Sequence, residues 1–141
     1  PSLKLIKTDN YNDSLEQVFT PESTKRISEI LDSVASDNGS GYRAVIDGYS
    51  IAGKTGTAEM VIDGKYSKDG AKRTYFVGYS PADKPKYIMA VRLDHPKKCF
   101  VSWDPTLRNR CEGSNSASMA FQKAMQRILI NDQEINSQVK G

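Results

Sequence analysis

The chain has 141 residues, of which 38% are hydrophobic and 26% are charged, as expected for one globular domain or one piece of a larger domain. Its formal net charge of +3 is small and scattered, and neither a Lys/Arg run nor a basic patch with interleaved aromatic residues indicates a nucleic-acid partner. No apolar run approaches the roughly 18–20 residues that cross a bilayer.

The first ten residues lack the apolar region of a signal peptide, and the chain does not begin with Met. We therefore expect a fragment or a processed form, with any targeting segment upstream. Cys99 and Cys111 are either two free thiols or one disulfide worth about 3 kcal/mol, and a disulfide would indicate an oxidising compartment. Because the sequence has one His, a Cys2His2 zinc site is excluded and no metal is expected.

Residues 1–19 are predicted to be irregular or extended. The run Thr20-Pro21-Glu22 then predicts a helix start, because it supplies an N-cap hydroxyl, a Pro at the first helical position and an acid near the positive helix end. One apolar helix face follows, made of Ile27, Ile30, Leu31 and Val34. The turn residues "SDNGSG" end this helix, with Gly39 as the expected C-cap.

The middle of the chain predicts a small sheet. Residues 49–62 alternate with period two and predict one long strand. The polar segment "DGKYSKDGAK" predicts a turn, "RTYFVGYS" a second strand, "PADKPK" a second turn and "YIMAVRLD" a third strand. Because the connections are short, we expect a three-stranded antiparallel meander.

Residues 95–116 form a long irregular segment that holds the only Trp, Trp103. A last helix, capped by Asn115 or Ser116, has an apolar face of Ala117, Ala120, Phe121, Ala124, Met125, Ile128 and Leu129. The polar tail after Asn131 is expected to fray. The predicted fold class is therefore α+β, with an N-terminal and a C-terminal helix covering the sheet.

The segment "GYSIAGKTGT", residues 48–57, matches two motifs. As G-x-x-x-x-G-K-T it spells a phosphate-binding loop, which must follow a buried strand and open a helix. The flanks do not fit, because "RAVID" upstream is short and bracketed by charges, and Gly56 weakens helix initiation by up to ~1 kcal/mol. We therefore favour the second motif, K-T-G-T on a strand.

A strand that lines an acyl-transfer cleft needs three features, and this one has them in order. Lys54 offers a cation to a substrate carboxylate, Gly56 leaves room for a substrate backbone lying alongside, and Thr57 offers a backbone N–H to a developing oxyanion. On a strand, Lys54 and Gly56 share one face, and Thr55 and Thr57 share the other. The alternative is an ordinary Gly/Thr strand with a solvated Lys.

The segment "NGSGYRAVIDGYSIAGKTGTAE" resembles class B penicillin-binding proteins, in which a G-x-G-x-x-A turn leads through a Gly-Tyr pair into A-G-K-T-G-T-A. The stretch "YFVGYSPADKPKYIMAVRLDHPK" resembles the next two strands of the division-type members, and "GSNSASMAFQKAMQRIL" resembles their last helix. The resemblance covers roughly residues 17–130. It implies the penicillin-binding/serine β-lactamase-like fold, no cofactor, and a parent protein in the bacterial periplasm, anchored in the inner membrane by an N-terminal helix that this chain lacks.

The resemblance further implies that the parent is a D,D-transpeptidase that cross-links peptidoglycan stem peptides. A serine attacks the penultimate D-Ala carbonyl, D-Ala leaves, and an amine of a neighbouring stem resolves the acyl-enzyme. β-Lactams mimic the D-Ala-D-Ala end and acylate the same serine. By this resemblance Lys54 sets the electrostatics of the cleft, Gly56 lies in the substrate-binding strand, the Thr55 and Thr57 hydroxyls hold the terminal carboxylate, and the Thr57 amide is one oxyanion-hole donor. Divisome proteins are further implied partners.

The nucleophile is expected outside this chain. The family places S-x-x-K and then S-x-N well upstream of K-T-G, whereas the matching strings here begin at Ser36, at a predicted helix end, and at Ser137, in the C-terminal tail. Neither position suits a serine that needs a rigidly held base. We therefore expect residues 1–141 to be the C-terminal part of a transpeptidase domain, without the nucleophile-bearing helical half and inactive alone.

Residues 99–113 depart from the family, which commonly has a short Tyr-Gly-Gly link there, and Gly113 alone matches. Trp103 either forms a lid contact over the site or packs on a core edge, and His95 is expected to be structural. Two other functions stay open. One is a non-catalytic β-lactam-sensing module, and the other is a serine β-lactamase, for which no water-activating base is identified.

Overall fold

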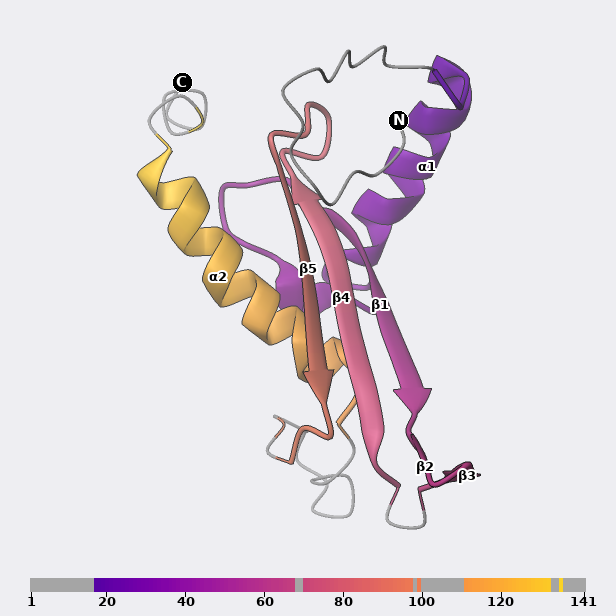
Figure 1. The fold of residues 1–141 in the computed structure, drawn as a ribbon. Coiled ribbons are helices and arrows are strands. Elements are labelled where there is room, and N and C mark those ends of the chain that lie inside the picture. The colour runs from indigo at the N-terminus through magenta and orange to yellow at the C-terminus, as the bar shows by residue number, and fades with distance from the viewer. Residues whose placement is uncertain (1–16, 68–69, 98, 100–110, 133–134, 136–141) are drawn as a thin grey trace, which may run out of the picture.

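The computed structural model describes residues 17–67, 70–97, 99, 111–132 and 135. In chain order the elements are α1 (Pro21–Val34), the 3-10 turn η1 (Tyr42–Ala44), β1 (Ala52–Glu59), β2 (Val61–Ile62), β3 (Lys65–Tyr66), β4 (Lys72–Ser80), β5 (Tyr87–Asp94), the 3-10 turn η3 (Gly113–Asn115) and α2 (Ala117–Asn131) (Figure 1). The predicted α+β class is confirmed.

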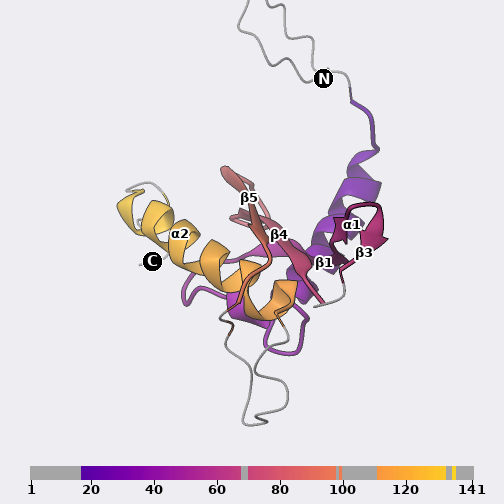
Figure 2. The ribbon, with the colours of Figure 1, turned by 60° about the horizontal axis from the view of Figure 1, so that its bottom comes forward.

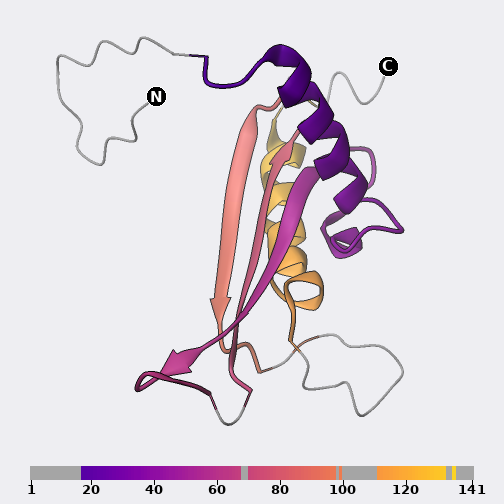
Figure 3. The ribbon, with the colours of Figure 1, turned by 90° about the vertical axis from the view of Figure 1, so that its right-hand side faces the viewer.

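Three strands form an antiparallel sheet in the order β1-β4-β5, so the predicted meander is confirmed. The register places Thr55 of β1 opposite Phe76 of β4, and Phe76 opposite Val91 of β5. α2 runs along one face of this sheet, while α1 lies beside β1 and away from α2 (Figures 1 and 3). Figure 2 shows α2 near the β5 side of the strands and α1 near the β1 side.

The core lies between α2 and the sheet. Phe76 and Phe121 are fully buried there with ring centroids 4.7 Å apart, and one face of β5 packs against the same cluster through Tyr87, Met89, Val91 and Leu93. The buried residues of α2 are Ala117, Ser118, Phe121, Met125 and Leu129, so the predicted apolar face is confirmed at four positions. Ala120 is half-buried, and the prediction is wrong at Ala124 and Ile128, which are exposed. Ile135 is buried as well, so the predicted fraying tail is wrong at this residue, and the rest of the tail beyond Asp132 lies outside the described residues.

α1 begins as predicted. Thr20 is the N-cap, its hydroxyl oxygen accepts a hydrogen bond from the Ser23 N–H at 3.2 Å, and Pro21 is the first helical residue. The expected covering role is only partly met, because α1 has no buried residue and Ile27 and Ile30 are 54% and 59% exposed. Leu31 and Val34 of the predicted face are partly buried, whereas Ile27 and Ile30 face away from the described part of the chain.

The predicted C-cap at Gly39 is wrong. The helix ends at Val34 with Ala35 as its C-cap. Position 39 requires glycine for another reason than helix capping. A β-carbon at Gly39 would lie 2.1 Å from the Val34 carbonyl oxygen. The chain thus folds back tightly over the helix end, which a larger side chain would prevent.

The predicted strand over residues 49–62 is too long at both ends. Regular pairing with β4 covers Ala52–Glu59 only. Beyond it, the Met60 N–H donates to the Ala71 carbonyl. β2, at the end of the predicted strand, and β3, inside the segment predicted as a turn, form a separate short hairpin. Asp63 and Gly64 connect them with φ of 51° and 75°, the left-handed conformation that tight hairpin turns require. The tight turn at Asp63 and Gly64 therefore ends the long strand that the alternating pattern predicted.

Candidate functional site

The four K-T-G-T residues lie in the middle of β1. Lys54, Thr55, Gly56 and Thr57 pair with Val77, Phe76, Tyr75 and Thr74 of β4. The backbone is therefore extended where a phosphate-binding loop would curl into a helix, and the phosphate-loop alternative is excluded. Among the described residues no strand pairs with the other edge of β1, so that edge is open to a ligand.

The two faces of β1 separate these side chains as predicted. Thr55 and Thr57 stand opposite Phe76 and Thr74, whose side chains are fully buried on the α2 side, so the two threonines share that face. Lys54 belongs to the opposite face and is exposed. Its ammonium group donates a hydrogen bond to the Thr55 carbonyl oxygen at 2.9 Å, so the cation lies at the strand itself.

Gly56 keeps the open face of the strand shallow. A β-carbon at this position would lie 3.3 Å from the β-carbon of Tyr75. A side chain here would therefore press on Tyr75 and stand above the surface along which a peptide-like ligand would lie. The predicted role of Gly56 as a residue without a side chain is consistent with this geometry.

The Thr55 hydroxyl meets a residue that sequence reasoning missed. Ser40 Oγ lies 3.2 Å from Thr55 Oγ1. Ser40 stands between two glycines, and a β-carbon at the second of them, Gly41, would lie 2.9 Å from the Phe76 ring. The loop can approach the sheet this closely because Gly41 has no side chain. The Gly-Ser-Gly run indicated that this loop could approach another element closely, but it did not indicate which strand the loop would contact.

The Thr57 hydroxyl meets a second missed residue. The Gly113 N–H donates a hydrogen bond to Thr57 Oγ1 at 3.0 Å, across 56 positions of sequence. Gly113 opens η3, the short turn that precedes α2. The segment around Gly113 was predicted only to be irregular. The match of Gly113 to the family pattern was the one sequence feature that indicated a role for this residue.

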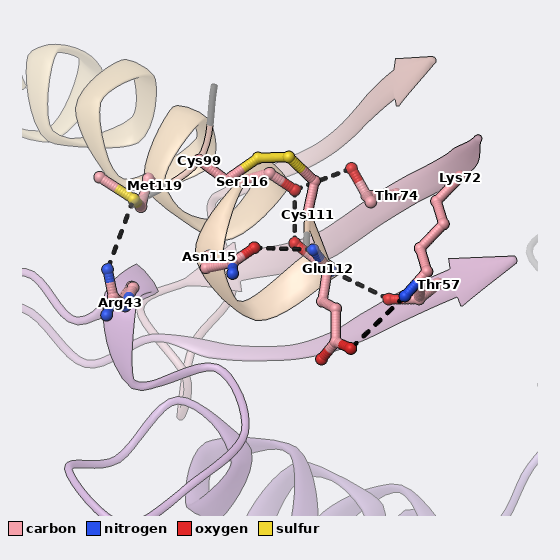
Figure 4. Close-up of a disulfide and its surroundings, with 11 residues drawn as sticks. Arg43, Thr57, Lys72, Thr74, Cys99, Cys111, Glu112, Asn115, Ser116 and Met119 are labelled. Carbon is pink, nitrogen blue, oxygen red and sulfur yellow. Dashed lines mark hydrogen bonds and ion pairs between the residues drawn. A yellow bond between two sulfur atoms is a disulfide. The ribbon is translucent and has the colours of Figure 1, made fainter. Parts of the chain in front are cut away.

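A polar cluster fixes η3 beside the strand (Figure 4). The Glu112 N–H donates to Asn115 Oδ1 at 2.7 Å. The Ser116 hydroxyl donates to the Glu112 carbonyl oxygen, and its oxygen lies 2.9 Å from Thr74 Oγ1, whose own proton can complete a hydrogen bond to it. Glu112 pairs with Lys72 of β4 at 3.6 Å. Since both members of that pair are partly exposed, the ion pair contributes little, and the buried hydroxyl contacts do most of the anchoring.

Cys99 and Cys111 form a disulfide, which resolves the alternative that the sequence left open (Figure 4). Their Cα atoms are 5.5 Å apart, and Cys111 is 3% exposed. Cys111 precedes Gly113 by two positions, so the bridge joins the segment after β5 directly to the start of η3. The residues between the cysteines that include Trp103 lie outside the described part of the chain.

Charged groups gather at the far end of the open sheet face. Asp94 accepts paired hydrogen bonds from Arg92 and from Arg73, with distances of 2.7–3.2 Å. These hydrogen bonds, first from Arg92 and then from Arg73, hold the pKa of the Asp94 carboxyl well below its usual range. Arg73 pairs with Ala58, the residue after Thr57, so this cluster borders the K-T-G-T strand.

The remaining candidates take no part in the site. Ser36 donates to the Ser33 carbonyl oxygen at 2.7 Å, just beyond α1, and the second string, from Ser137, lies outside the described residues. His95 follows β5 with φ of 47°, and its N–H donates to the Lys72 carbonyl oxygen. Within the described ranges no cluster of His, Cys, Asp or Glu could hold a metal ion, and no helix is long and apolar enough to span a membrane.

We compared the chain with known protein families and with curated proteins. The family described as the penicillin binding protein transpeptidase domain matches residues 3–126. The chain is 34% identical over 125 residues to "Peptidoglycan D,D-transpeptidase FtsI" of Buchnera aphidicola, which covers 88% of this chain and 19% of that protein. The chain therefore spans about a fifth of that relative's length.

Solved structures share the fold. The transpeptidase domain of the FtsI4 D,D-transpeptidase from Legionella pneumophila is similar with a TM-score of 0.61 and 32% identity, over 77% of this chain and 36% of that one. Penicillin binding protein 3 from Mycobacterium tuberculosis, solved in complex with ampicillin, is similar with a TM-score of 0.54 and 28% identity, over 76% of this chain and 25% of that one.

Proposed function

Because this chain belongs to the penicillin-binding protein transpeptidase domain family, we propose that it is the C-terminal part of the transpeptidase domain of a division-type peptidoglycan D,D-transpeptidase. The observation that carries the proposal is the K-T-G-T sequence on a paired strand whose outer edge is open in the described sheet. A stem peptide lies along this edge as an added strand, its backbone passing Gly56.

The side chains of β1 bind the terminal carboxylate of the D-Ala-D-Ala end. The Thr55 and Thr57 hydroxyls, which share one face, donate hydrogen bonds to the carboxylate, since charge-assisted hydrogen bonds to a carboxylate are the strong ones. Lys54, on the other face of the strand, sets the positive electrostatics of the cleft. The Thr57 amide is one donor of the oxyanion hole, where preorganised N–H groups stabilise the tetrahedral intermediate. Ser40 supports the Thr55 hydroxyl through the contact at 3.2 Å.

The chemistry is acyl transfer through a serine on the part of the domain that this chain does not contain. The serine oxygen attacks the penultimate D-Ala carbonyl, the terminal D-Ala leaves as its amine, and the amine of a neighbouring stem attacks the acyl-enzyme and releases the serine. β1 forms one wall of the cleft, and the serine-bearing part forms the other. The chain alone therefore lacks acylation activity.

The rest of the domain covers the apolar residues that this chain leaves open. Val18, Phe19, Ile27 and Ile30 are all more than half exposed along the start and the outer face of α1. Several large apolar side chains left exposed near one helix are what an interface would cover. We assign that surface to the upstream part of the same domain, because the chain accounts for only 36% of the similar Legionella transpeptidase domain.

β-Lactams act on the same edge in this proposal, and that a similar protein was solved in complex with ampicillin supports β-lactam binding by the family. The parent protein works in the bacterial periplasm, anchored upstream in the inner membrane, and meets divisome proteins there. The Cys99–Cys111 disulfide supports an oxidising compartment. No observation favours the β-lactam sensor or the β-lactamase over the transpeptidase.

A labelled penicillin tests this proposal on the protein that contains this chain and its upstream part. Stable covalent labelling, absent when this chain is tested alone, is expected. Rapid release of hydrolysed drug would identify a β-lactamase instead. Labelling without cross-linking of stem peptides would identify the sensor.

A further inference from the structure

The hydroxyl of Thr57 already accepts one hydrogen bond, and its own proton is not used in that bond. A threonine hydroxyl carries one proton to donate and two lone pairs to accept. The Gly113 N–H fills one lone pair at 3.0 Å, so the hydroxyl proton turns away from Gly113. The Thr57 side chain is exposed, and its proton is therefore available to an acceptor that arrives from outside.

Gly113 can make this contact only because it is glycine. A β-carbon there would lie 2.7 Å from the Gly56 carbonyl oxygen, 2.7 Å from the Tyr75 carbonyl oxygen and 3.0 Å from the Gly56 nitrogen. All three are backbone atoms of paired strands, which cannot move aside cheaply. η3 thus rests directly on the backbone of the K-T-G-T strand.

The disulfide restrains the approach of Gly113. Cys111 is buried and lies two positions before it, and its partner Cys99 lies five positions beyond the end of β5. Besides the bridge, the described contacts between this segment and the sheet are the Gly113–Thr57 hydrogen bond, the Ser116–Thr74 hydroxyl contact and the partly exposed Lys72–Glu112 ion pair (Figure 4). The bridge shortens that connection and limits the positions that Gly113 can take.

We propose that Gly113 and the Cys99–Cys111 disulfide are positioning elements of the carboxylate-binding site, which hold the Thr57 hydroxyl with its proton directed to the substrate carboxylate. The proposal rests on the function assigned above and names a device that acts on Thr57 from the side opposite the substrate edge. Gly113 and the cysteines touch no substrate, and they act through Thr57.

The test measures acylation of the full-length protein by a penicillin with a free carboxylate and by its methyl ester. The variant is Cys99→Ser/Cys111→Ser, and the control is Tyr87→Phe. That control removes the hydroxyl that donates to Asp132 at 2.6 Å, and it lies about 20 Å from Thr57 along the sheet. We expect the disulfide variant to lose about tenfold in the second-order acylation rate constant with the free acid, as for one charge-assisted hydrogen bond. The loss should appear in the dissociation constant of the initial complex, with the ester unaffected.

A double-mutant cycle separates positioning from mere stability. In a Thr57→Val background, removal of the disulfide should cause no further loss with the free acid, because the group on which it acts is gone. Thr57→Ser, which keeps the hydroxyl, should restore the dependence on the disulfide. An equal loss in both backgrounds, or an equal loss with acid and ester, would overturn the proposal.

Amide hydrogen exchange distinguishes this proposal from the function on which it rests. If the unmodified protein is not acylated at all, the transpeptidase assignment fails. The exchange rate of the Gly113 N–H still tests whether the disulfide restrains Gly113. Faster exchange at Gly113 in the double Ser variant than in Tyr87→Phe supports restraint by the disulfide. The same exchange rate in both variants contradicts it.

Discussion

Gly113 lies directly on Gly56, since a β-carbon at Gly113 would come within 2.7 Å of the Gly56 carbonyl oxygen. The turn before α2 and the middle of the K-T-G-T strand are therefore in backbone contact. This contact joins the candidate site to the start of the helix that forms the core, and a change on either side is transmitted to the other.

The first prediction concerns that contact. Gly113→Ala should lower the free energy of unfolding by about 1–3 kcal/mol, because the added methyl group must displace backbone atoms. Urea denaturation measures the loss. Gly64→Asn is the matched control: Gly64 sits at φ of 75° with open space around it, and Asn tolerates that conformation. Equal stability of Gly113→Ala and the unmodified protein would contradict the close approach.

The second prediction concerns Lys54. Lys54→Ala should reduce acylation of the full-length protein by a β-lactam by roughly 100-fold, by analogy with the loss of one preorganised electrostatic group. Its effect on the free energy of unfolding should stay within about 0.5 kcal/mol, because the side chain is exposed. Stopped-flow acylation and urea denaturation measure the two effects.

Lys65→Ala provides the control for Lys54, since Lys65 is an equally exposed lysine on the hairpin outside the site. It should leave both measurements unchanged. Unaltered acylation of the Lys54 variant would remove this residue from the site, and a large loss of stability would show that its role is structural.

The sequence predicted most of the sheet and little of the contacts around the site. β4 and β5 were predicted nearly to the residue, because their turns are short and their alternation is strong. The K-T-G-T strand was placed correctly because both flanks opposed a helix. Alternation and turn signals depend only on residues that are close in sequence, so a single sequence is enough to predict them.

Ser40 and Gly113 could not be predicted, because each meets the site across a long stretch of chain. Gly113 reaches Thr57 over 56 positions, and Ser40 reaches Thr55 over 15. Neither contact has a periodic signature, since both depend on how a loop is carried over the sheet by packing elsewhere. The exposed face of α1 was missed for a related reason: its apolar pattern predicts burial but not the segment that buries it.

The third prediction concerns pH and Asp132. The Lys86 ammonium at 2.8 Å and the Tyr87 hydroxyl at 2.6 Å hold the pKa of the Asp132 carboxyl well below its usual range. The folded-state pKa is thus lower than the unfolded-state value of about 3.9. The stabilisation is fully present above that value and is lost as the pH falls through the lower folded-state pKa.

Unfolding experiments from pH 7 to pH 2 would test this dependence. The unmodified protein should lose stability below about pH 4, and Asp132→Asn should lose less over the same range, because its side chain has no proton to gain. Parallel curves for the two proteins would show that Asp132 has the same pKa in both states.

The last prediction concerns the outer face of α1. Ile30 is 59% exposed, and the proposed function requires the upstream part of the domain to cover it. In the full-length protein, Ile30→Glu should therefore cost about 2 kcal/mol or more, from lost burial of the side chain and from the charge placed in an interface. Ile62→Glu is the matched control, since Ile62 is 50% exposed on the β2–β3 hairpin, and the same change there should cost less than about 0.5 kcal/mol. Thermal unfolding, read together with labelling by penicillin, measures both. If the two variants are equally stable, α1 faces solvent in the parent protein, and the two parts of the domain must meet through another surface.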